Sequence, residues 1–517
     1  MHTTAARKRY LTGMSQAASP ARPIRFVHRG ETLSVQGLES TTSVLNWLRE
    51  HAGCTGTKEG CTEGDCGACT VLVGELQADD SVSFKPVNSC IQFLPTLDGK
   101  VLVTVEDLGG RHPAQQAMVA CHGSQCGFCT PGFVMSLAAC HDRHRAAGTQ
   151  ATRQQLADDL SGNLCRCTGY RPILDAGEHM FTLSAGEAKP LASASTVAAL
   201  KALRGDAALQ FNAPTPFHAP RSLDDLAALC AAKPGARLLA GGTDVALWVN
   251  KQFRKLGEII YLGEVAELKK IELAKGWLTI GAGASLEAAW AALARHWPDS
   301  REMGLRFASL PVREVGTMGG NIANGSPIGD SAPVLIALGA EISLRLGDRR
   351  RTMPLQDFYL DYLRNLLEPG EFVQAMRLPL PGSDQAQRET LRVYKLSKRH
   401  DCDISGLAAG LWLKFEDDRV VDARFAFGGM AAIVKRAAEA EAAVRGQLWT
   451  ETTVRSAMRA LDADFQPLSD LRASASYRVQ VLGNLLQRFW LESQGAKNIN
   501  LEDFDLADLD ALEGENT

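Results

Sequence analysis

The sequence predicts an α+β protein of several domains. Its 517 residues are enough for about three domains of ~150 residues each. Strand and helix patterns alternate near the N-terminus, a helical pattern follows from residue 112 to 183, and mixed strand and helix patterns occupy the chain from residue 211. A hydrophobic content of 45% and a charged content of 22% are ordinary for a soluble globular protein.

Composition and charge limit the kinds of partner that this chain is expected to bind. The formal net charge of −4 gives no reason to expect nucleic acid, and no apolar run reaches the ~18 residues of a membrane span. Residues 1–23 are basic without a hydrophobic segment, which predicts a disordered tail rather than a signal peptide, and Met14 would serve equally well as the start. Many clustered cysteines in such a chain predict a reducing, cytoplasmic location.

The first predicted domain, residues 24–108, has the pattern of a β-grasp fold. Residues 24–36 alternate in polarity around a turn at Arg29-Gly30, which indicates a β-hairpin. The other expected elements are a helix at 43–52 and strands at 70–74 and 100–105.

The predicted domains that follow differ in their patterns. Residues 109–185 suit a helical bundle, because Pro113, Pro131 and Pro172 each fit the first turn of a helix. Residues 186–210 are rich in Ala, Ser, Lys and Gly, which predicts a linker or a weak helix. The remaining divisions are an α/β domain at 211–385, a second α/β domain at 386–497 and an acidic tail at 498–517.

Eight of the thirteen cysteines fall into two groups of four. The first group has the spacing C-x4-C-x2-C followed by a distant cysteine, which is the plant-ferredoxin pattern for a 2Fe–2S cluster. The second group has C-x2-C and, after a helical stretch, C-x-C. The first quartet is Cys61, Cys66, Cys69 and Cys90, and the second quartet is Cys126, Cys129, Cys165 and Cys167.

Glycines support a cluster at the first quartet. Gly60, Gly64 and Gly67 let the backbone wrap closely around a cluster, because glycine tolerates positive φ. Zinc binding or buried structural cysteines are the alternatives, although zinc sites usually repeat C-x2-C at both ends. A Rieske-type site with His122 is disfavoured, since no second Cys/His pair has suitable spacing.

Five cysteines lie outside the quartets. Cys121 and Cys140 are near enough in sequence to the second quartet to compete for ligation. Cys140 lies within a helical pattern beside Ala138 and Ala139, which favours a buried packing role. The other three are Cys54, Cys230 and Cys402.

Two glycine-containing stretches, LLAGGTDV (238–245) and TMGGNIANGSPIGD (317–330), predict loops that bring backbone N–H groups to a pyrophosphate. Taken alone this signal is weak, because Gly-Gly turns are common in α/β proteins. A third stretch begins like G-x-G-x-x-G at Gly281 but has Leu286 in the last glycine position. We therefore expect no Rossmann fingerprint.

Three strings carry a resemblance to a known family: TGTKEGCTEGDCGACTV (55–71), HGSQCGFCTPGFVMS (122–136) and GNLCRCTGYRPIL (162–174). They resemble the two iron–sulfur domains of the xanthine dehydrogenase/aldehyde oxidase family of molybdenum hydroxylases. The resemblance implies one 2Fe–2S cluster on each quartet. It also implies that the second cluster lies next to a molybdenum cofactor, with Gln125 and Cys129 facing the pterin, and that the first lies towards a flavin.

The two glycine-containing stretches resemble the FAD loops of the same family, whose flavin domain has a vanillyl-alcohol-oxidase-like fold. Phe307 would then lie against the flavin, whereas without the resemblance a core aromatic is the alternative. The implied FAD contacts are Leu238, Leu239, Ala240, Gly241, Gly242, Thr243, Asp244, Val245, Phe307, Thr317, Met318, Gly319, Gly320, Asn321, Asp330, Val373 and Lys395.

The string KLSKRHDCDI (395–404) resembles the family segment beside the flavin that helps to govern NAD access. Its spacing is one residue longer than in some members, so Asp401 and Asp403 belong either to such a site or to a solvated charged loop. No catalytic side-chain constellation other than the flavin is expected in this chain.

The resemblance implies the electron-transfer subunit of a split enzyme, because no molybdenum-cofactor domain follows residue 500. A separate large subunit would hold the molybdenum cofactor in an α2β2 heterotetramer. Electrons from the oxidation of hypoxanthine or xanthine to urate would pass through the two clusters to FAD and then to NAD+. The alternatives are a subunit of an enzyme for aldehydes or other N-heterocycles, a non-catalytic assembly or sensor protein, and a stand-alone NADH-dependent reductase.

Overall fold

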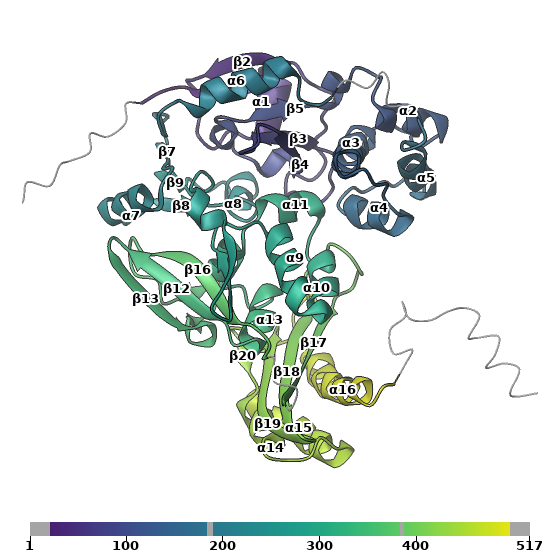
Figure 1. Ribbon diagram of the computed structural model, residues 1–517, viewed down its shortest axis with the longest axis vertical. Helices are drawn as coiled ribbons and strands as arrows, with labels where there is room; N and C mark the ends of the chain where they lie inside the picture. Colours follow the sequence, from purple (N-terminus) through teal and green to yellow (C-terminus); the bar gives the residue numbers. More distant parts are fainter. Residues whose placement is uncertain (1–20, 184–189, 383–386, 497–517) are drawn as a thin grey trace, which may run out of the picture.

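The computed structural model describes residues 21–183, 190–382 and 387–496 (Figure 1). The N-terminal part, drawn in purple and blue, lies at one end of the molecule. The teal and green middle part lies below it, and the long green strands extend to the other end. In the part of the chain that the structure describes, no helix is long and apolar enough to span a membrane.

The first region is a β-grasp. Its five-stranded sheet has the order β2-β1-β5-β3-β4, and β1 pairs in parallel with β5. The predicted hairpin is confirmed: Arg29 and Gly30 both have positive φ (54° and 80°), as a tight two-residue hairpin turn requires. The elements are β1 (Ile24–His28), β2 (Glu31–Val35), α1 (Val44–Glu50), β3 (Thr70–Leu76), β4 (Val82–Asn88) and β5 (Val101–Val103).

The second region is a helical bundle packed on the β-grasp sheet. Pro113, Pro131 and Pro172 each lie in a first helical turn, as expected. Phe133 of α3 is fully buried in one apolar core with Leu72 of β3. The helices are α2 (Pro113–Ala120), α3 (Thr130–Ala147), α4 (Arg153–Leu160) and α5 (Arg171–His179).

The segment at 186–210, for which the sequence predicts a linker or a weak helix, contains a helix in its described part. Residues Ala194–Arg204 form helix α6, which lies against the β-grasp sheet (Figure 1). Ser193 caps its N-terminus, and Leu200 and Leu203 are 1% exposed in the core shared with Phe133. Burial of these two leucines holds a segment in place whose composition alone suggests a connector.

The middle region contains two sheets with helices between them. The small sheet has the order β6-β7-β9-β8, and the larger has the order β10-β11-β16-β12-β13. Its strands are β6 (Leu209–Phe211), β7 (Phe217–Ala219), β8 (Arg237–Leu239), β9 (Ile259–Tyr261), β10 (Ile271–Ala274), β11 (Trp277–Gly281), β12 (Glu341–Leu346), β13 (Arg349–Pro354) and β16 (Phe372–Pro379), beside a hairpin of β14 (Tyr359–Asp361) and β15 (Arg364–Asn365). Its helices are α7 (Leu223–Ala232), α8 (Val245–Asn250), α9 (Leu286–His296), α10 (Arg301–Arg306), α11 (Leu310–Val315), α12 (Met318–Asn324) and α13 (Ser331–Ala337).

The C-terminal region is a four-stranded antiparallel sheet of order β17-β18-β19-β20, with three helices packed on it. Helix α13 of the middle region packs against β18 and β19, which joins the two regions. The elements are β17 (Gln387–Leu396), β18 (Leu407–Glu416), β19 (Arg419–Gly428), β20 (Lys435–Arg436), α14 (Ala438–Val444), α15 (Glu451–Asp464) and α16 (Ala475–Ser493).

Candidate functional site

The first cysteine quartet converges although Cys90 is distant in sequence. Cys61, Cys66 and Cys69 lie in the loop between α1 and β3, and Cys90 lies in the short helix after β4. The sulfur atoms of Cys69 and Cys90 are 3.3 Å apart, and both residues are buried. The backbone N–H groups of Glu63 and Cys66 point at the Cys61 sulfur, at 3.5 and 3.4 Å.

This pocket of sulfur atoms suits a 2Fe–2S cluster. Hydrogen bonds among the neighbouring thiols lower the pKa of Cys61 and raise the pKa values of Cys66 and Cys90, so these thiols lie within contact distance of one another, as ligands of one cluster must. A Cβ at Gly60 would lie 2.8 Å from the Cys66 sulfur, so only glycine leaves room there. Among the described residues, no group of three or more His, Cys, Asp or Glu side chains is arranged to hold a metal ion.

The second quartet pairs two loops of the helical bundle. Cys126 and Cys129 precede α3, and Cys165 and Cys167 lie between α4 and α5. Burial, together with the neighbouring thiol of Cys165, raises the pKa of Cys129 to about 12. The neighbouring thiol of Cys126 raises the pKa of Cys167. Each cysteine of C-x2-C therefore lies beside one of C-x-C, which is the paired arrangement that a 2Fe–2S cluster needs.

Thr168 and Tyr170 support the second quartet, and the sequence did not single them out. The Thr168 hydroxyl donates to the Cys165 sulfur at 3.2 Å. The Tyr170 hydroxyl accepts from the backbone N–H of Cys165 at 3.0 Å, while Tyr170 itself has a positive φ of 68°. Burial raises the pKa of Cys165, but the hydrogen bonds from Thr168 and from the backbone outweigh it, so the pKa is lowered.

One backbone hydrogen bond and one side-chain hydrogen bond hold the two quartets against each other. The N–H of Leu164, next to Cys165, donates to the carbonyl of Cys66 at 3.0 Å. The buried Asn163 side chain donates to the carbonyl of Gly67, also at 3.0 Å. A Cβ at Gly67 would lie 2.4 Å from the carbonyl oxygen of Gly162, so the glycine permits this close approach.

The cysteines outside the quartets lie elsewhere. Cys140 is 1% exposed in the middle of α3, which confirms the predicted packing role. Cys121 ends α2, and Cys54 is buried beside the His28 ring. Burial raises the pKa of Cys230 to about 12.

The two predicted FAD loops lie side by side. One loop joins β8 to α8, and the other begins α12. A Cβ at Gly241 would lie 1.9 Å from the carbonyl oxygen of Val315, and a Cβ at Gly320 would lie 3.9 Å from the Cβ of Ala240. The close backbone packing at Gly241 is compatible with a loop that holds a pyrophosphate by its main chain.

Not every predicted FAD residue is equally placed for contact. The side chains of Leu239 and Met318 are buried in the core. The backbone N–H groups of Met318 and Gly319 donate to Ala284 and Ala282, so neither is free to bind a phosphate. Gly320 is exposed, and Val373 on β16 is 5% exposed. The predicted FAD contacts in these loops that are not fully buried are Leu238, Ala240, Gly241, Gly242, Thr243, Asp244, Val245, Thr317, Gly320 and Asn321.

Asp330 and Lys395 form a buried ion pair between the start of α13 and the end of β17. Their charged atoms are 2.5 Å apart, and the two residues are 4% and 6% exposed. The other carboxylate oxygen of Asp330 accepts from the Ser405 hydroxyl at 2.6 Å. The structure thus brings together two residues that lie 65 positions apart in sequence.

Phe307 is half-buried in the turn between α10 and α11, with its ring centroid 6.5 Å from that of Trp290. Arg313, which sequence reasoning missed, stabilises this turn through hydrogen bonds to its backbone carbonyls. Its guanidinium donates to the carbonyls of Leu305, Phe307 and Ala308 at 3.0, 3.2 and 2.9 Å, and the Arg313 side chain is 3% exposed. Nothing in the local sequence distinguishes it from a solvated helical arginine.

The segment at 397–404 folds back on the iron–sulfur region. The Cys402 thiol lies 3.7 Å from the Ser161 hydroxyl. Asp403 accepts from the backbone N–H groups of Arg399 and Ile404, both at 2.9 Å, and so stabilises the loop. Asp401 is exposed beside His400.

Hydrogen bonds also link the surroundings of the first quartet to a predicted FAD loop and to α8, which follows it. The Gln92 side chain, two residues after Cys90, donates to the carbonyl of Gly241 at 3.2 Å. Asn250, at the end of α8, donates to the carbonyl of Cys90 at 2.9 Å. These contacts place the first quartet between the second quartet and the predicted FAD loops.

Three family models match the chain. They are a [2Fe-2S] binding domain over residues 104–178, an FAD binding domain in molybdopterin dehydrogenase over 209–381, and a CO dehydrogenase flavoprotein C-terminal domain over 392–493. The predicted fold class, with β-grasp and helical iron–sulfur regions followed by FAD-binding and C-terminal flavoprotein regions, is confirmed.

Curated relatives span the same regions. Xanthine dehydrogenase of Emericella nidulans is 30% identical over 90% of this chain and 38% of its own length. Xanthine dehydrogenase of Oryza sativa subsp. japonica is 30% identical over 79% of this chain and 35% of its own length. Aldehyde oxidase 2 of Cavia porcellus is 28% identical over 90% of this chain and 39% of its own length. The chain therefore spans less than half the length of these relatives.

Solved structures are similar at a TM-score of 0.49. CO dehydrogenase from Oligotropha carboxidovorans is 28% identical and covers 53% of this chain and 94% of its own chain. Quinoline 2-oxidoreductase from Pseudomonas putida 86 is 25% identical and covers 56% of this chain and 99% of its own chain. The matched domains and relatives together assign the chain: it belongs to the molybdenum hydroxylase family and carries that family's iron–sulfur and FAD-binding regions.

Proposed function

We propose that this chain is the electron-transfer subunit of a molybdenum hydroxylase of the xanthine dehydrogenase type. A separate large subunit holds the molybdenum cofactor, the two subunits assemble as an α2β2 heterotetramer, and NAD+ is the final electron acceptor. When bound, the two 2Fe–2S clusters carry single electrons and FAD collects two of them for hydride transfer.

The order of the three sites is the observation that carries this proposal. The second quartet touches the first through Leu164 and Cys66, and the first touches an FAD loop through Gln92 and Gly241. A chain of adjacent sites in this order suits one-way transfer from an external donor towards a flavin. The protein's own contribution is to hold the sites at fixed spacing and to keep the first quartet dry, with Cys69 and Cys90 buried.

The second quartet offers a face for the large subunit. Cys126 and Cys167 are exposed. Three large apolar side chains beside the quartet are also exposed: 47% for Phe128 and 40% each for Leu164 and Tyr170. Exposed apolar side chains around a redox site suit burial by a partner protein. Gln125 lies in the same loop, as a residue near a partner's pterin would.

The xanthine substrate is supported by the two xanthine dehydrogenases that match 90% and 79% of the chain. An aldehyde-oxidising complex is the second candidate, because aldehyde oxidase 2 of Cavia porcellus matches over the same extent. The substrate pocket would lie in the large subunit, so residues of this chain do not discriminate between them.

The test is to purify the tagged chain with its co-purifying partners and to assay iron, FAD and molybdenum. The complex is then given xanthine, an aldehyde or quinoline, first with NAD+ and then with ferricyanide. We expect about four irons and one FAD per chain, with xanthine-dependent NADH formation. If the complex oxidised only an aldehyde or only quinoline, that class of compound would replace xanthine as the proposed substrate. Reduction of ferricyanide but not NAD+ would contradict the acceptor, and a chain without iron or flavin would contradict the proposal itself.

A further inference from the structure

Helix α11 lies where the β-grasp, the helical bundle and the middle region meet. It packs against β4 of the β-grasp, α4 of the bundle and α9 of its own region (Figure 1). The two cysteine quartets belong to the first two regions, and the predicted FAD loops belong to the third. A helix in this position influences how the three sites lie relative to one another.

One face of α11 contacts both the predicted FAD loop and the core of the first quartet. The Val315 carbonyl lies so close to Gly241 that a Cβ there would be 1.9 Å from its oxygen. Val312 and Val315 pack against the apolar core that contains Cys69 and Cys90. The same two turns of helix therefore touch the FAD loop and the surroundings of two predicted cluster ligands.

The start of α11 contacts the loop of the second quartet. Ser309 caps the helix by accepting from the backbone N–H of Val312 at 3.4 Å. A Cβ at Gly162 would lie 2.1 Å from the Cβ of Ser309, so only glycine fits at this point of the loop. Gly162 lies three residues before Cys165, which connects this contact to the second quartet.

Glu314 of α11 is the charged link to the β-grasp. Its carboxylate lies 3.4 Å from the ammonium of Lys85 on β4, and the two side chains are 18% and 35% exposed. Lys85 lies five residues before Cys90, the last ligand of the first quartet. The ion pair therefore joins the helix beside the FAD loop to the strand that leads to a cluster ligand.

The helical bundle contributes a second cation to Glu314. Burial, together with the charge of Glu287, raises the pKa of Glu314, and the positive charges of Lys85 and Arg143 oppose this rise. Arg143 belongs to α3 and also pairs with Asp159 of α4. Cations from both iron–sulfur regions thus act on one carboxylate of the FAD-binding region.

Partly exposed ion pairs usually add little to stability, so the placement of this one matters more than its strength. We propose that Glu314 is a positioning residue for electron transfer. It holds both iron–sulfur regions against α11 and thereby fixes the position of the first cluster relative to the flavin, to which electrons pass one at a time. The inference rests on the proposed function, in which the first cluster reduces the flavin.

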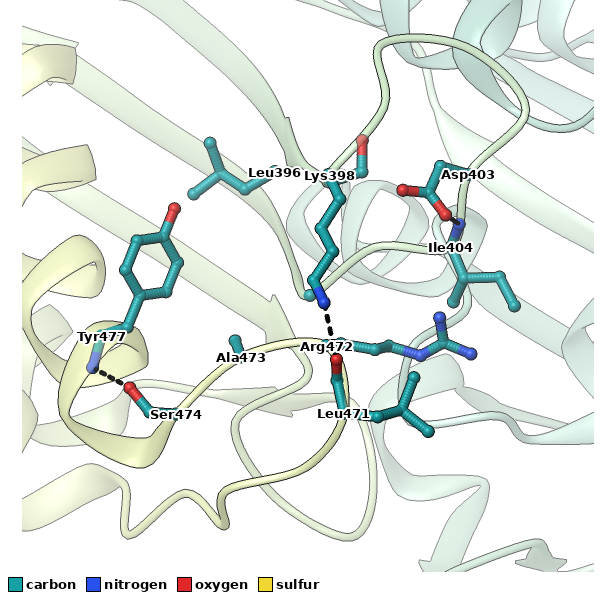
Figure 2. A pocket seen from close by; sticks show the side chains of 11 residues that line it. Leu396, Lys398, Asp403, Ile404, Leu471, Arg472, Ala473, Ser474 and Tyr477 are labelled. Carbon is teal, nitrogen blue, oxygen red and sulfur yellow. Dashed lines mark hydrogen bonds between the residues drawn. The ribbon is translucent and has the colours of Figure 1, made fainter.

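The junction at Glu314 is separate from the cavity of about 510 Å³ between residues 396–406 and 471–477 (Figure 2). Neither α11 nor Lys85 nor Arg143 contributes to the cavity lining. Substitutions at Glu314 and Lys85 therefore leave the lining residues unchanged, and their effect on the flavin is measured without any electron acceptor present.

The experiment uses the complete complex carrying Glu314→Gln, Lys85→Met or both substitutions. The matched control is Glu451→Gln, which removes a carboxylate that pairs with Arg455 on the exposed surface of α15. Reducing substrate is added without acceptor, and stopped-flow absorbance follows the clusters and the flavin. Electron paramagnetic resonance measures the spin coupling between the two reduced clusters. Iron content, FAD content and the reduction potentials of all three centres are measured on the same samples.

We expect each single variant to reduce its flavin roughly ten-fold more slowly, because a small displacement of reacting partners costs rate steeply. The second cluster is reduced at the unaltered rate, the spin coupling is weaker, and the control behaves as the unaltered complex does. The two substitutions change the local charge in opposite directions, so slower reduction in both is the signature of positioning. The double variant is no slower than the single variants, because the two residues act as a pair.

Flavin reduction at the unaltered rate in both single variants would overturn the inference, even if thermal stability or FAD content fell, because Glu314 would then be structural only. Opposite changes of rate in Glu314→Gln and Lys85→Met, with matching shifts of potential, would also overturn it, since the pair would then act through its charges. If the unaltered complex shows no transfer from cluster to flavin, the proposed function fails and the spin coupling alone decides. Weaker coupling in the variants would then support a positioning role between the iron–sulfur regions, and unchanged coupling would overturn it.

Discussion

The backbone N–H of Leu164 donates to the carbonyl of Cys66 across the boundary between the two iron–sulfur regions. Because Leu164 precedes Cys165, a single hydrogen bond and a few covalent bonds join a ligand residue of one quartet to a ligand residue of the other. The neighbouring Asn163 reinforces the junction from a buried position.

Replacing Asn163 should loosen this junction. The Asn163 amide donates to Gly67 and Thr70, and its oxygen accepts from the Ser136 hydroxyl at 2.7 Å. Asn163→Ala removes these three bonds and leaves the buried Ser136 hydroxyl without its acceptor, while the Gly67 carbonyl keeps the hydroxyl and N–H of Thr70. We therefore expect the free energy of unfolding to fall by about 1–3 kcal/mol. Asn163→Asp keeps the acceptor for Ser136, but it buries a carboxylate against the Gly67 carbonyl. Thermal unfolding of both variants measures the effect, and a change below about 0.5 kcal/mol in Asn163→Ala would contradict it.

Arg313 should matter for the turn that carries Phe307. Arg313→Met leaves three carbonyls without a donor, which we expect to cost about 3 kcal/mol of stability and to lower FAD content. Arg313→Lys keeps the charge but has one amine in place of the planar guanidinium, so an intermediate loss is expected. The control, Arg455→Ala, removes an exposed pair on α15 that is worth less than about 0.5 kcal/mol. Full FAD content in Arg313→Met would contradict a role for this turn at the flavin.

Variants of the buried ion pair between Asp330 and Lys395 should distinguish its contribution to stability from its contribution to FAD binding. Lys395→Met leaves a buried carboxylate without its cation, which should cost about 3–5 kcal/mol. The double variant Asp330→Leu/Lys395→Met removes both charges and should recover most of that stability. We expect FAD content to stay low in both variants, because both lack the predicted contacts. Normal FAD content in the double variant would make the pair structural only.

Histidine protonation should make the helical region sensitive to acid. Burial, together with the charges of His141 and Arg145, lowers the pKa of His112 to about 4. Neutral His112 caps α2 by accepting from the N–H of Ala114 at 3.2 Å. The unfolded chain takes up this proton near pH 6.5 and the folded chain only near pH 4, so stability is complete above pH 6.5 and falls as the pH drops towards 4.

The loss attributable to His112 amounts to about 3 kcal/mol. His112→Asn keeps an N-cap acceptor without a titrating ring, so its unfolding free energy should vary less between pH 6.5 and 4. Denaturant unfolding at several pH values measures this. Equal pH dependence in the two proteins would show that other groups, such as His141, dominate.

Local sequence signals predicted the parts of the fold and site that depend on local chemistry. The Arg29-Gly30 turn needed two residues of positive φ, and the cysteine spacings needed only the geometry of a cluster. The contacts that stabilise the site and the fold from distant parts of the sequence could not be predicted, because only tertiary packing brings them together. Arg313 looks like any helical arginine until its turn folds over it, and α6 looks like a linker until its leucines are buried.

The glycine-containing loops illustrate the same limit within one motif. The sequence treats Met318, Gly319 and Gly320 as equivalent members of an FAD loop. In the fold, the N–H groups of the first two donate to the carbonyls of Ala284 and Ala282 after β11, whereas that of the exposed Gly320 donates to the Thr317 hydroxyl. The cavity between residues 396–406 and 471–477 could not be predicted from sequence patterns either, since two of its lining residues, Asp403 and Arg472, lie 69 positions apart in the chain.

The order of the three sites is tested most directly by breaking the middle one. In a complex carrying Cys90→Ser, with Cys230→Ser as the control, reducing substrate is added without NAD+. Electron paramagnetic resonance follows the clusters, and visible absorbance follows the flavin. We predict that the second cluster is reduced while the flavin stays oxidised, and that the control behaves as the unaltered complex does. Flavin reduction at the unaltered rate in Cys90→Ser, with its first cluster absent, would contradict the proposed path.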